Sequence, residues 1–154
     1  MEMKIYNDII IDHHLHPRHL HEPEHATLSL MGSDAVCGDM LTLHLSVDGN
    51  RITDGSFTGV GCAFSQASAD MMLDLVIGGT PQRAKYLYGI LSGMMDGTIT
   101  DGLDDIGNAA VFGAAADISS RKRCVMLCWD TLMDMLDTLN ERRETLRNED
   151  LYKS

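Results

Sequence analysis

The sequence predicts an α+β fold in which a small antiparallel sheet of about three strands packs against several helices, with a long C-terminal helix. Three observations favour this class. One short segment alternates strictly between apolar and polar residues before a turn, several later segments carry apolar residues at helical spacing, and the C-terminal stretch keeps that spacing longest. At 154 residues, the chain suits one domain that buries a core without disulfides.

The first predicted element is an amphipathic helix at residues 4–15, which ends before Pro17 because a residue that precedes proline disfavours helix. A loop is expected at about 16–27. Six histidines crowd this region, and a second metal site is conceivable there. A solvated, partly disordered segment fits the pattern better, with His13 capping the end of the helix. The histidines are His13, His14, His16, His19, His21 and His25.

The sheet is predicted from residues 41–47, which alternate strictly, and from residues 51–57, which return after the turn Asp48-Gly49-Asn50. Residues 28–31 are the candidate third strand. A third strand is expected because a hairpin of two strands alone is only marginally stable in water.

The C-terminal half is predicted to be helical. Residues 65–77 carry apolar residues at helical spacing and stop at Gly78-Gly79. Thr80-Pro81 supplies an N-cap followed by proline at the first helical position, which opens a helix to about residue 95. The remaining segments are a loop at about 96–107, a short helix at 108–118, a long helix at 122–147 and a solvated tail at about 141–154.

Composition argues against several functions. The chain has 23 acidic and 12 basic residues, and its formal charge of −11 repels nucleic acid and anionic lipid. No apolar run approaches the roughly 20 residues that cross a bilayer, and the N-terminus lacks a signal-peptide pattern. We therefore expect a cytoplasmic protein that binds neither nucleic acid nor membrane. In that reducing compartment, four cysteines are more often metal ligands or reactive thiols than cystines.

The chemistry is expected at Cys37, Asp39, Cys62 and Cys124. In Cys37-Gly38-Asp39, both functional side chains can lie on one side, and Gly38 removes a Cβ that would crowd a metal. Cys62 lies at a predicted helix start and Cys124 follows three cations, two settings that favour the thiolate. Three thiolates and one carboxylate are compatible with tetrahedral zinc. The carboxylate is the harder ligand, which hints at an exchangeable site.

Other interpretations of these cysteines remain open. Scattered core cysteines beside a turn aspartate would give the same composition without any site. Cys128 lies four residues after Cys124 and could reach the site as a reserve ligand. We favour a small buried hydrophobe at this position, since free cysteine often has that role.

Several motifs in order carry a family resemblance. The chain resembles the U-type iron–sulfur cluster assembly proteins, an IscU/NifU-N-like family, over roughly residues 4–140. Within it, the chain is similar to the SufU branch, because Arg123 replaces a histidine before the last cysteine and an inserted segment separates Cys62 from Cys124. The motifs are Tyr6, Asp12-His13, Pro17-Arg18, Cys37-Gly38-Asp39, Gly59-x-Gly61-Cys62-Ala63-x-Ser65, Ala67-Ser68-Ala69, Met71-Met72, Arg121-x-Arg123-Cys124 and Trp129.

The resemblance implies a SufE/IscU-like fold and zinc held by Cys37, Asp39, Cys62 and Cys124. It implies a zinc-dependent sulfurtransferase that acts only together with a PLP-dependent cysteine desulfurase of the SufS type. Cys37 would be the sulfur acceptor, released when a desulfurase side chain takes its place on the metal. Arg121 is a candidate to orient the partner or to hydrogen-bond the acceptor loop. Downstream cluster assembly proteins are further expected partners.

The chain departs from the family pattern just before the first cysteine. Asp34-Ala35-Val36 stands where the family usually has an Asn-Pro pair, so we expect a more mobile and more acidic loop. A negative charge at Asp34 would oppose thiolate formation at Cys37.

Three functions are compatible with the sequence. The favoured one is the zinc-bound sulfur acceptor. The second is a scaffold that builds a [2Fe–2S] cluster on the same thiolates, and the third is a structural zinc domain without transfer chemistry.

Overall fold

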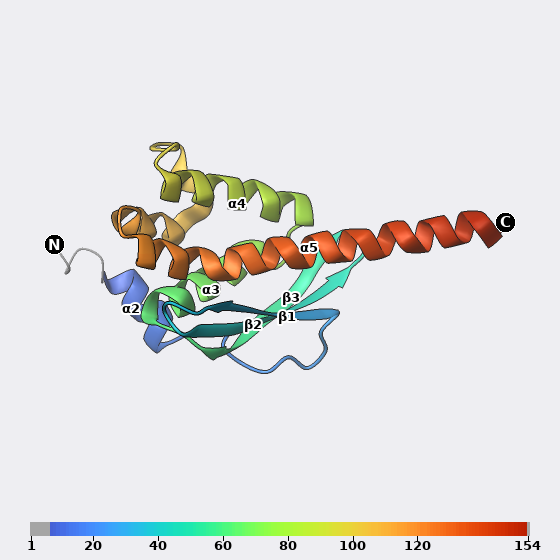
Figure 1. Ribbon diagram of the computed structural model, residues 1–154, viewed down its shortest axis with the longest axis horizontal. Helices are drawn as coiled ribbons and strands as arrows, with labels where there is room; N and C mark the ends of the chain where they lie inside the picture. The colour runs from blue at the N-terminus through green and yellow to red at the C-terminus, as the bar shows by residue number, and fades with distance from the viewer. Residues whose placement is uncertain (1–6, 154) are drawn as a thin grey trace.

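The computed structural model describes the backbone of residues 7–153 and the side chains of residues 7–149. It confirms the α+β class: an antiparallel sheet lies against several helices, and the last helix is the longest (Figure 1). The elements in chain order are α2 (Asp8–Leu15), β1 (Leu28–Asp34), β2 (Asp39–Asp48), β3 (Arg51–Val60), α3 (Ala63–Val76), α4 (Pro81–Asp96), the 3-10 helix η1 (Leu103–Ala115) and α5 (Ser119–Lys153).

The sheet has the order β1-β2-β3, so β2 is the central strand. The predicted hairpin is confirmed, with Leu43 opposite Phe57, and the candidate third strand is confirmed as β1. The turn between β1 and β2 carries the first cysteine, and Asp34 and Asp39 pair at its base. The end of the sheet at the β1–β2 turn is therefore the end where the predicted ligands Cys37 and Asp39 lie.

Helices α3 and α5 cover one face of the sheet, and the segment 16–27 runs along the other side (Figure 1). Leu41, Leu43 and Leu45 of β2 are buried, as expected for alternate residues that face the helices. Strand β1 lies so close to α5 that a Cβ at Gly32 would collide with the hydroxyl of Thr131. This close packing holds the N-terminal turns of α5 beside the β1–β2 turn.

The helices differ from the sequence prediction at three boundaries. Helix α2 begins at Asp8, where the side chain of Asn7 accepts a hydrogen bond from Ile10 N at 3.0 Å, while residues 4–6 lie outside the described residues. The 3-10 helix η1 replaces the end of the expected loop and most of the expected short helix, and it is kinked at Gly107. Helix α5 begins at Ser119 and continues to Lys153, so the expected solvated tail is helical, and its residues 141–149 are exposed.

A buried carboxylate anchors the start of the histidine-rich region, whereas residues 16–27 are mostly exposed, as expected of a solvated segment. Asp70 of α3 is fully buried and accepts hydrogen bonds from the backbone N–H groups of Arg18 and His19, at 2.8 and 2.9 Å. His13 is only 3% exposed, and its Nδ1 lies 2.6 Å from Asp70 Oδ2. His13 lies inside α2 and anchors this helix to α3 rather than capping its end. Asp74 lies nearby and contacts His19 Nε2 at 2.7 Å.

No helix within residues 7–153 is both long and apolar enough to cross a membrane.

We predict that Asp70→Ala lowers the free energy of unfolding by about 3–5 kcal/mol, because it leaves His13 and two backbone donors without their acceptor. Urea denaturation followed by circular dichroism measures this loss. The matched control is Asp74→Ala, which removes an exposed partner of His19 from the same helix and should stay within about 1 kcal/mol of the wild type. Equal losses in the two variants would contradict the anchoring role of Asp70.

Candidate metal centre

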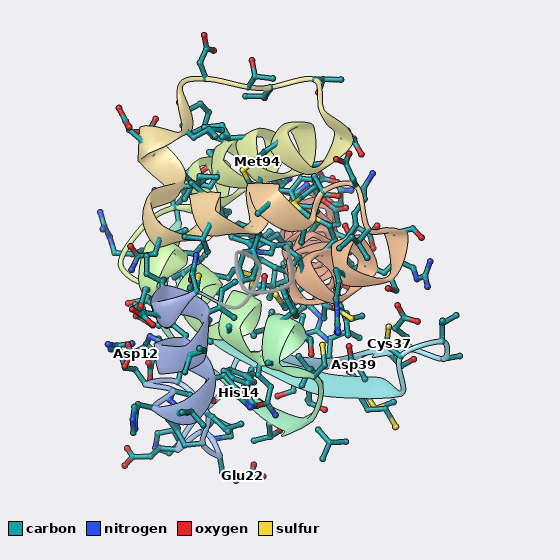
Figure 2. All side chains as sticks on the ribbon, turned by 90° about the vertical axis from the view of Figure 1, so that its left-hand side faces the viewer. Asp12, His14, Glu22, Cys37, Asp39 and Met94 are labelled. Carbon is teal, nitrogen blue, oxygen red and sulfur yellow. The ribbon has the colours of Figure 1, made fainter. Side chains whose placement is uncertain are left out.

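Four elements bring the four predicted ligands to one end of the sheet. Cys37 lies in the β1–β2 turn, Asp39 is the first residue of β2, Cys62 is the N-cap of α3, and Cys124 lies near the start of α5. Figure 2 shows Cys37 and Asp39 close together at this end, with the labelled Asp12 and His14 on the other side of the view.

The ligand atoms approach each other closely enough for one metal ion. Cys124 Sγ lies 3.3 Å from Cys37 Sγ, and Cys62 Sγ lies 3.8 Å from Asp39 Oδ2. The ligand atoms of Cys37, Asp39 and Cys124 all lie within 4.8 Å of one another. Neighbouring ligands of a tetrahedral zinc ion are about 3.5–3.8 Å apart, given bonds of ~2.3 Å to sulfur and ~2.0–2.2 Å to oxygen. The chemistry of the donor set therefore fits zinc, and the structure brings three of the predicted ligands together. Cys62 contacts Asp39, but its Sγ does not lie within 4.8 Å of all three other ligand atoms.

The centre is buried on its inner side. Cys124 is 0% exposed and Asp39 is 2% exposed, whereas Cys37 and Cys62 are half-buried. Burial, together with hydrogen bonds to Cys37 and Cys62, raises the pKa of the Cys124 thiol far above its usual value. The neighbouring cations do not offset this burial, contrary to the sequence expectation. A cation within the ligand set is what would stabilise the Cys124 thiolate.

The three cations before Cys124 each have another partner. The guanidinium of Arg121 lies 4.8 Å from the ring centroid of Phe64, at the start of α3. Lys122 Nζ contacts Asp96 Oδ1 at 2.6 Å, and Arg123 Nε donates to Asp34 Oδ2 at 3.3 Å. Arg123 therefore forms a salt bridge to the loop that carries Cys37.

Asp34 organises the turn that presents Cys37. Its Oδ1 accepts hydrogen bonds from Val36 N at 2.9 Å and from Cys37 N at 3.4 Å, and its backbone oxygen accepts from Gly38 N at 2.8 Å. Burial favours the neutral acid, but these bonds and the charge of Arg123 outweigh it and lower the pKa of Asp34. The carboxylate therefore closes the turn, and its charge is paired with Arg123. The expected effects on loop mobility and on the Cys37 thiolate stay predictions.

Two glycines are required here for different reasons. Gly38 has a φ of +72°, and a Cβ built there meets nothing within 4 Å. Its positive φ gives this glycine a conformational role, and the expectation that a side chain would crowd a bound metal stays a prediction. At Gly61, a Cβ would collide with the hydroxyl of Ser65. The bare glycine lets Cys62 N reach Asp39 Oδ1, at 2.9 Å.

Cys128 lies apart from the ligand set. Its Sγ contacts the hydroxyl of Ser68 at 3.6 Å and the backbone oxygen of Val125 at 3.9 Å. Burial raises the pKa of this thiol to about 12, so it remains protonated near neutral pH. These contacts favour the interpretation as a small buried core residue over that of a reserve ligand.

The sequence did not reveal the pairing of Asp34 with Arg123. The two residues are separated by 89 positions, and nothing in the local pattern links them. The signals in the sequence were an acidic residue, Asp34, in the loop before Cys37 and an arginine, Arg123, directly before Cys124. Neither residue indicates by itself that the other is its partner.

Comparison with known proteins identifies relatives of both functional types. The scaffold protein IscU of Streptococcus pyogenes serotype M1 is 30% identical over 132 residues, which cover 86% of this chain and 82% of that protein. The zinc-dependent sulfurtransferase SufU of Bacillus subtilis is also 30% identical, over 128 residues that cover 83% of this chain and 86% of that protein. Equal identity to the two means that sequence similarity does not choose between their activities.

Solved structures share the fold. The crystal structure of the SufU protein from Fervidobacterium islandicum AW-1 matches with a TM-score of 0.78 and 34% identity, over 83% of this chain and 93% of that chain. The N-terminal part of a NifU-like protein from Brucella abortus matches with a TM-score of 0.82 at 20% identity, which shows the fold alone. The model of the NifU-like N-terminal domain matches residues 5–125. The chain therefore belongs to the NifU-like N-terminal domain family.

Proposed function

We propose that this protein is a zinc-dependent sulfur acceptor in iron–sulfur cluster biogenesis, which receives persulfide sulfur on Cys37 from a PLP-dependent cysteine desulfurase of the SufS type. The observation that carries the proposal is the unequal burial of the ligand set. Cys37 lies on a turn whose neighbour Val36 is 75% exposed, whereas Cys124 and Asp39 are buried. Cys37 and Cys62 are the two half-buried thiols, and Cys37 is the one carried by an exposed turn, where a partner's active site can reach it, while Asp39 and Cys124 are buried beneath.

The residues that would hold zinc are Cys37, Asp39, Cys62 and Cys124. When bound, the ion supplies the positive charge that favours thiolates in a buried site where desolvation opposes them. The backbone N–H of Cys62 holds the Asp39 carboxylate in place. The proposal places the protein in the cytoplasm, where such thiols remain reduced.

The transfer itself is a thiol exchange. The Cys37 thiolate attacks the outer sulfur of the desulfurase persulfide, a new S–S bond forms on Cys37, and the old S–S bond breaks. Its electron pair leaves on the desulfurase thiolate, so no external oxidant or reductant is needed. The Asp34 turn and its salt bridge to Arg123 fix the backbone from which Cys37 reacts. Arg121, in the first turn of α5 with its guanidinium over the ring of Phe64, remains a candidate for orienting the partner.

A scaffold function is the second candidate. It is favoured by the 30% identity to the IscU protein of Streptococcus pyogenes, and by a ligand set that iron accepts as well as zinc. In that function, the same thiolates would hold a [2Fe–2S] cluster before it passes to downstream cluster assembly proteins.

We predict that protein purified without oxygen contains one equivalent of zinc per chain and shows no visible absorption band. Asp39→Ala and Cys124→Ala should lose most of this zinc, because each removes a buried ligand that the other side chains cannot replace. The matched control, Cys128→Ala, should keep it. Metal analysis with an absorption spectrum measures both quantities. Iron with sulfide-to-metal absorption would instead support the scaffold function.

We predict that Cys37→Ala abolishes sulfur acceptance and the stimulation of a cysteine desulfurase, because the accessible thiol is missing. Cys128→Ala, a control that removes a buried thiol of the same chain, should accept sulfur at the wild-type rate. The measurement is peptide mass mapping after incubation with desulfurase and cysteine. A persulfide found first on Cys62 or Cys124 would refute the assignment of Cys37.

We predict that Arg123→Ala slows sulfur acceptance by about two- to fivefold, since an ion pair with an exposed arginine makes only a modest contribution. The zinc content should remain unchanged, because Arg123 touches no ligand atom directly but binds Asp34. The neighbouring Lys122→Ala, which removes a contact to Asp96 instead, is the control and should leave the rate unchanged. Single-turnover transfer rates distinguish the two; equal rates for all three proteins would rule out a positioning role for Arg123.

A further inference from the structure

A groove of about 300 Å³ lies at the end of the sheet opposite the metal centre. It runs between the β2–β3 hairpin tip, the start of α4 and the C-terminal half of α5, which extends past the body of the protein (Figure 1). Its apolar lining includes Val47, Leu136, Leu139 and Leu146. These residues come from two elements, so the groove is a feature of the fold and not of one helix.

The charge of this groove is opposite to that of the chain as a whole. The formal net charge of the protein is −11, yet the described lining residues include Lys85, Arg142 and Arg143 and no carboxylate. Lys85 Nζ lies 3.5 Å from Asp137 Oδ1, which lies outside the lining. Within the part of the chain whose side chains are described, neither Arg142 nor Arg143 has an ion-pair partner. The groove therefore combines an apolar floor with uncompensated positive charge.

The helix end that borders the groove has little packing of its own. Leu146 is 61% exposed, and residues 141–149 of α5 are all exposed. Most of the stability of a protein helix comes from burial of an apolar face, and this end of α5 has no such burial. A binding partner that covered Leu146 would supply it.

We propose that this groove binds an acidic amphipathic segment of another protein, which places apolar side chains against Leu139 and Leu146 and carboxylates against Arg142 and Arg143. Charge complementarity selects this occupant. A symmetric dimer across the groove is disfavoured because an isologous contact would bring the arginines of both copies together. Nucleic acid and anionic lipid share the required negative charge, but they spread it over an area wider than the groove, where the acidic remainder of the surface repels them. A short segment places its carboxylates within the groove, beside the arginines.

The test is fluorescence anisotropy with a labelled synthetic helical peptide that carries leucines on one face and glutamates on the other. Wild-type protein should bind it saturably, and binding should weaken as salt is raised. The double variant R142E/R143E should weaken binding by at least about tenfold, and Leu146→Glu should weaken it as well. The charge-matched control is R18E/K122E, which makes the same change in net charge away from the groove and should bind like the wild type.

Several results would overturn the proposal. These are no saturable binding to the wild type, an equal loss in the charge-matched control, or tighter binding of a peptide with lysines in place of the glutamates. Co-sedimentation with phosphatidylglycerol-containing vesicles that R142E/R143E abolishes would assign the groove to a membrane surface. A dimer in analytical ultracentrifugation that dissociates on the same substitution would assign it to a second copy of the chain. Sulfur acceptance by Cys37 is measured separately, so its failure leaves this test intact.

Discussion

The candidate metal centre depends on one hydrogen bond, from the backbone N–H of Cys62 to the Asp39 carboxylate. This bond joins the start of α3 to the start of β2, and it satisfies a carboxylate that is almost fully buried. Gly61 makes the approach possible, because any side chain there would collide with Ser65. Once α3 and β2 are joined in this way, packing of α5 against the same sheet brings Cys124 to the group.

Local sequence signals predicted the elements that depend on local physics. The alternation of residues 41–47 identified the central strand, and Thr80-Pro81 located the start of α4 to the residue. The alanine-rich stretch was predicted as a short helix after a loop. It folds instead as a 3-10 helix that already begins at Leu103 and has a kink at Gly107. Residues 141–149 are exposed, as expected, and the helix predicted to end at about residue 147 continues to Lys153.

Ordered motifs predicted the ligand set, whereas the residues that support it required the fold. Asp34 engages Arg123 across 89 positions, and Asp70 engages His13 across 57, so no window of sequence contains either pair. Both aspartates are acceptors for backbone N–H groups, a role that the sequence did not predict for either. Asp34 closes the turn that presents Cys37, and its charge is paired with the distant Arg123.

The length of α5 has a consequence for how partners are arranged. Cys124 and Arg142 belong to one uninterrupted helix, and at 1.5 Å per residue they are separated by roughly 27 Å along its axis. An uninterrupted helix of this kind is stiff and keeps its two ends at a nearly fixed distance. An enzyme docked at the thiol end and a peptide held at the overhanging end would not compete for space, so the order of their arrival need not be fixed.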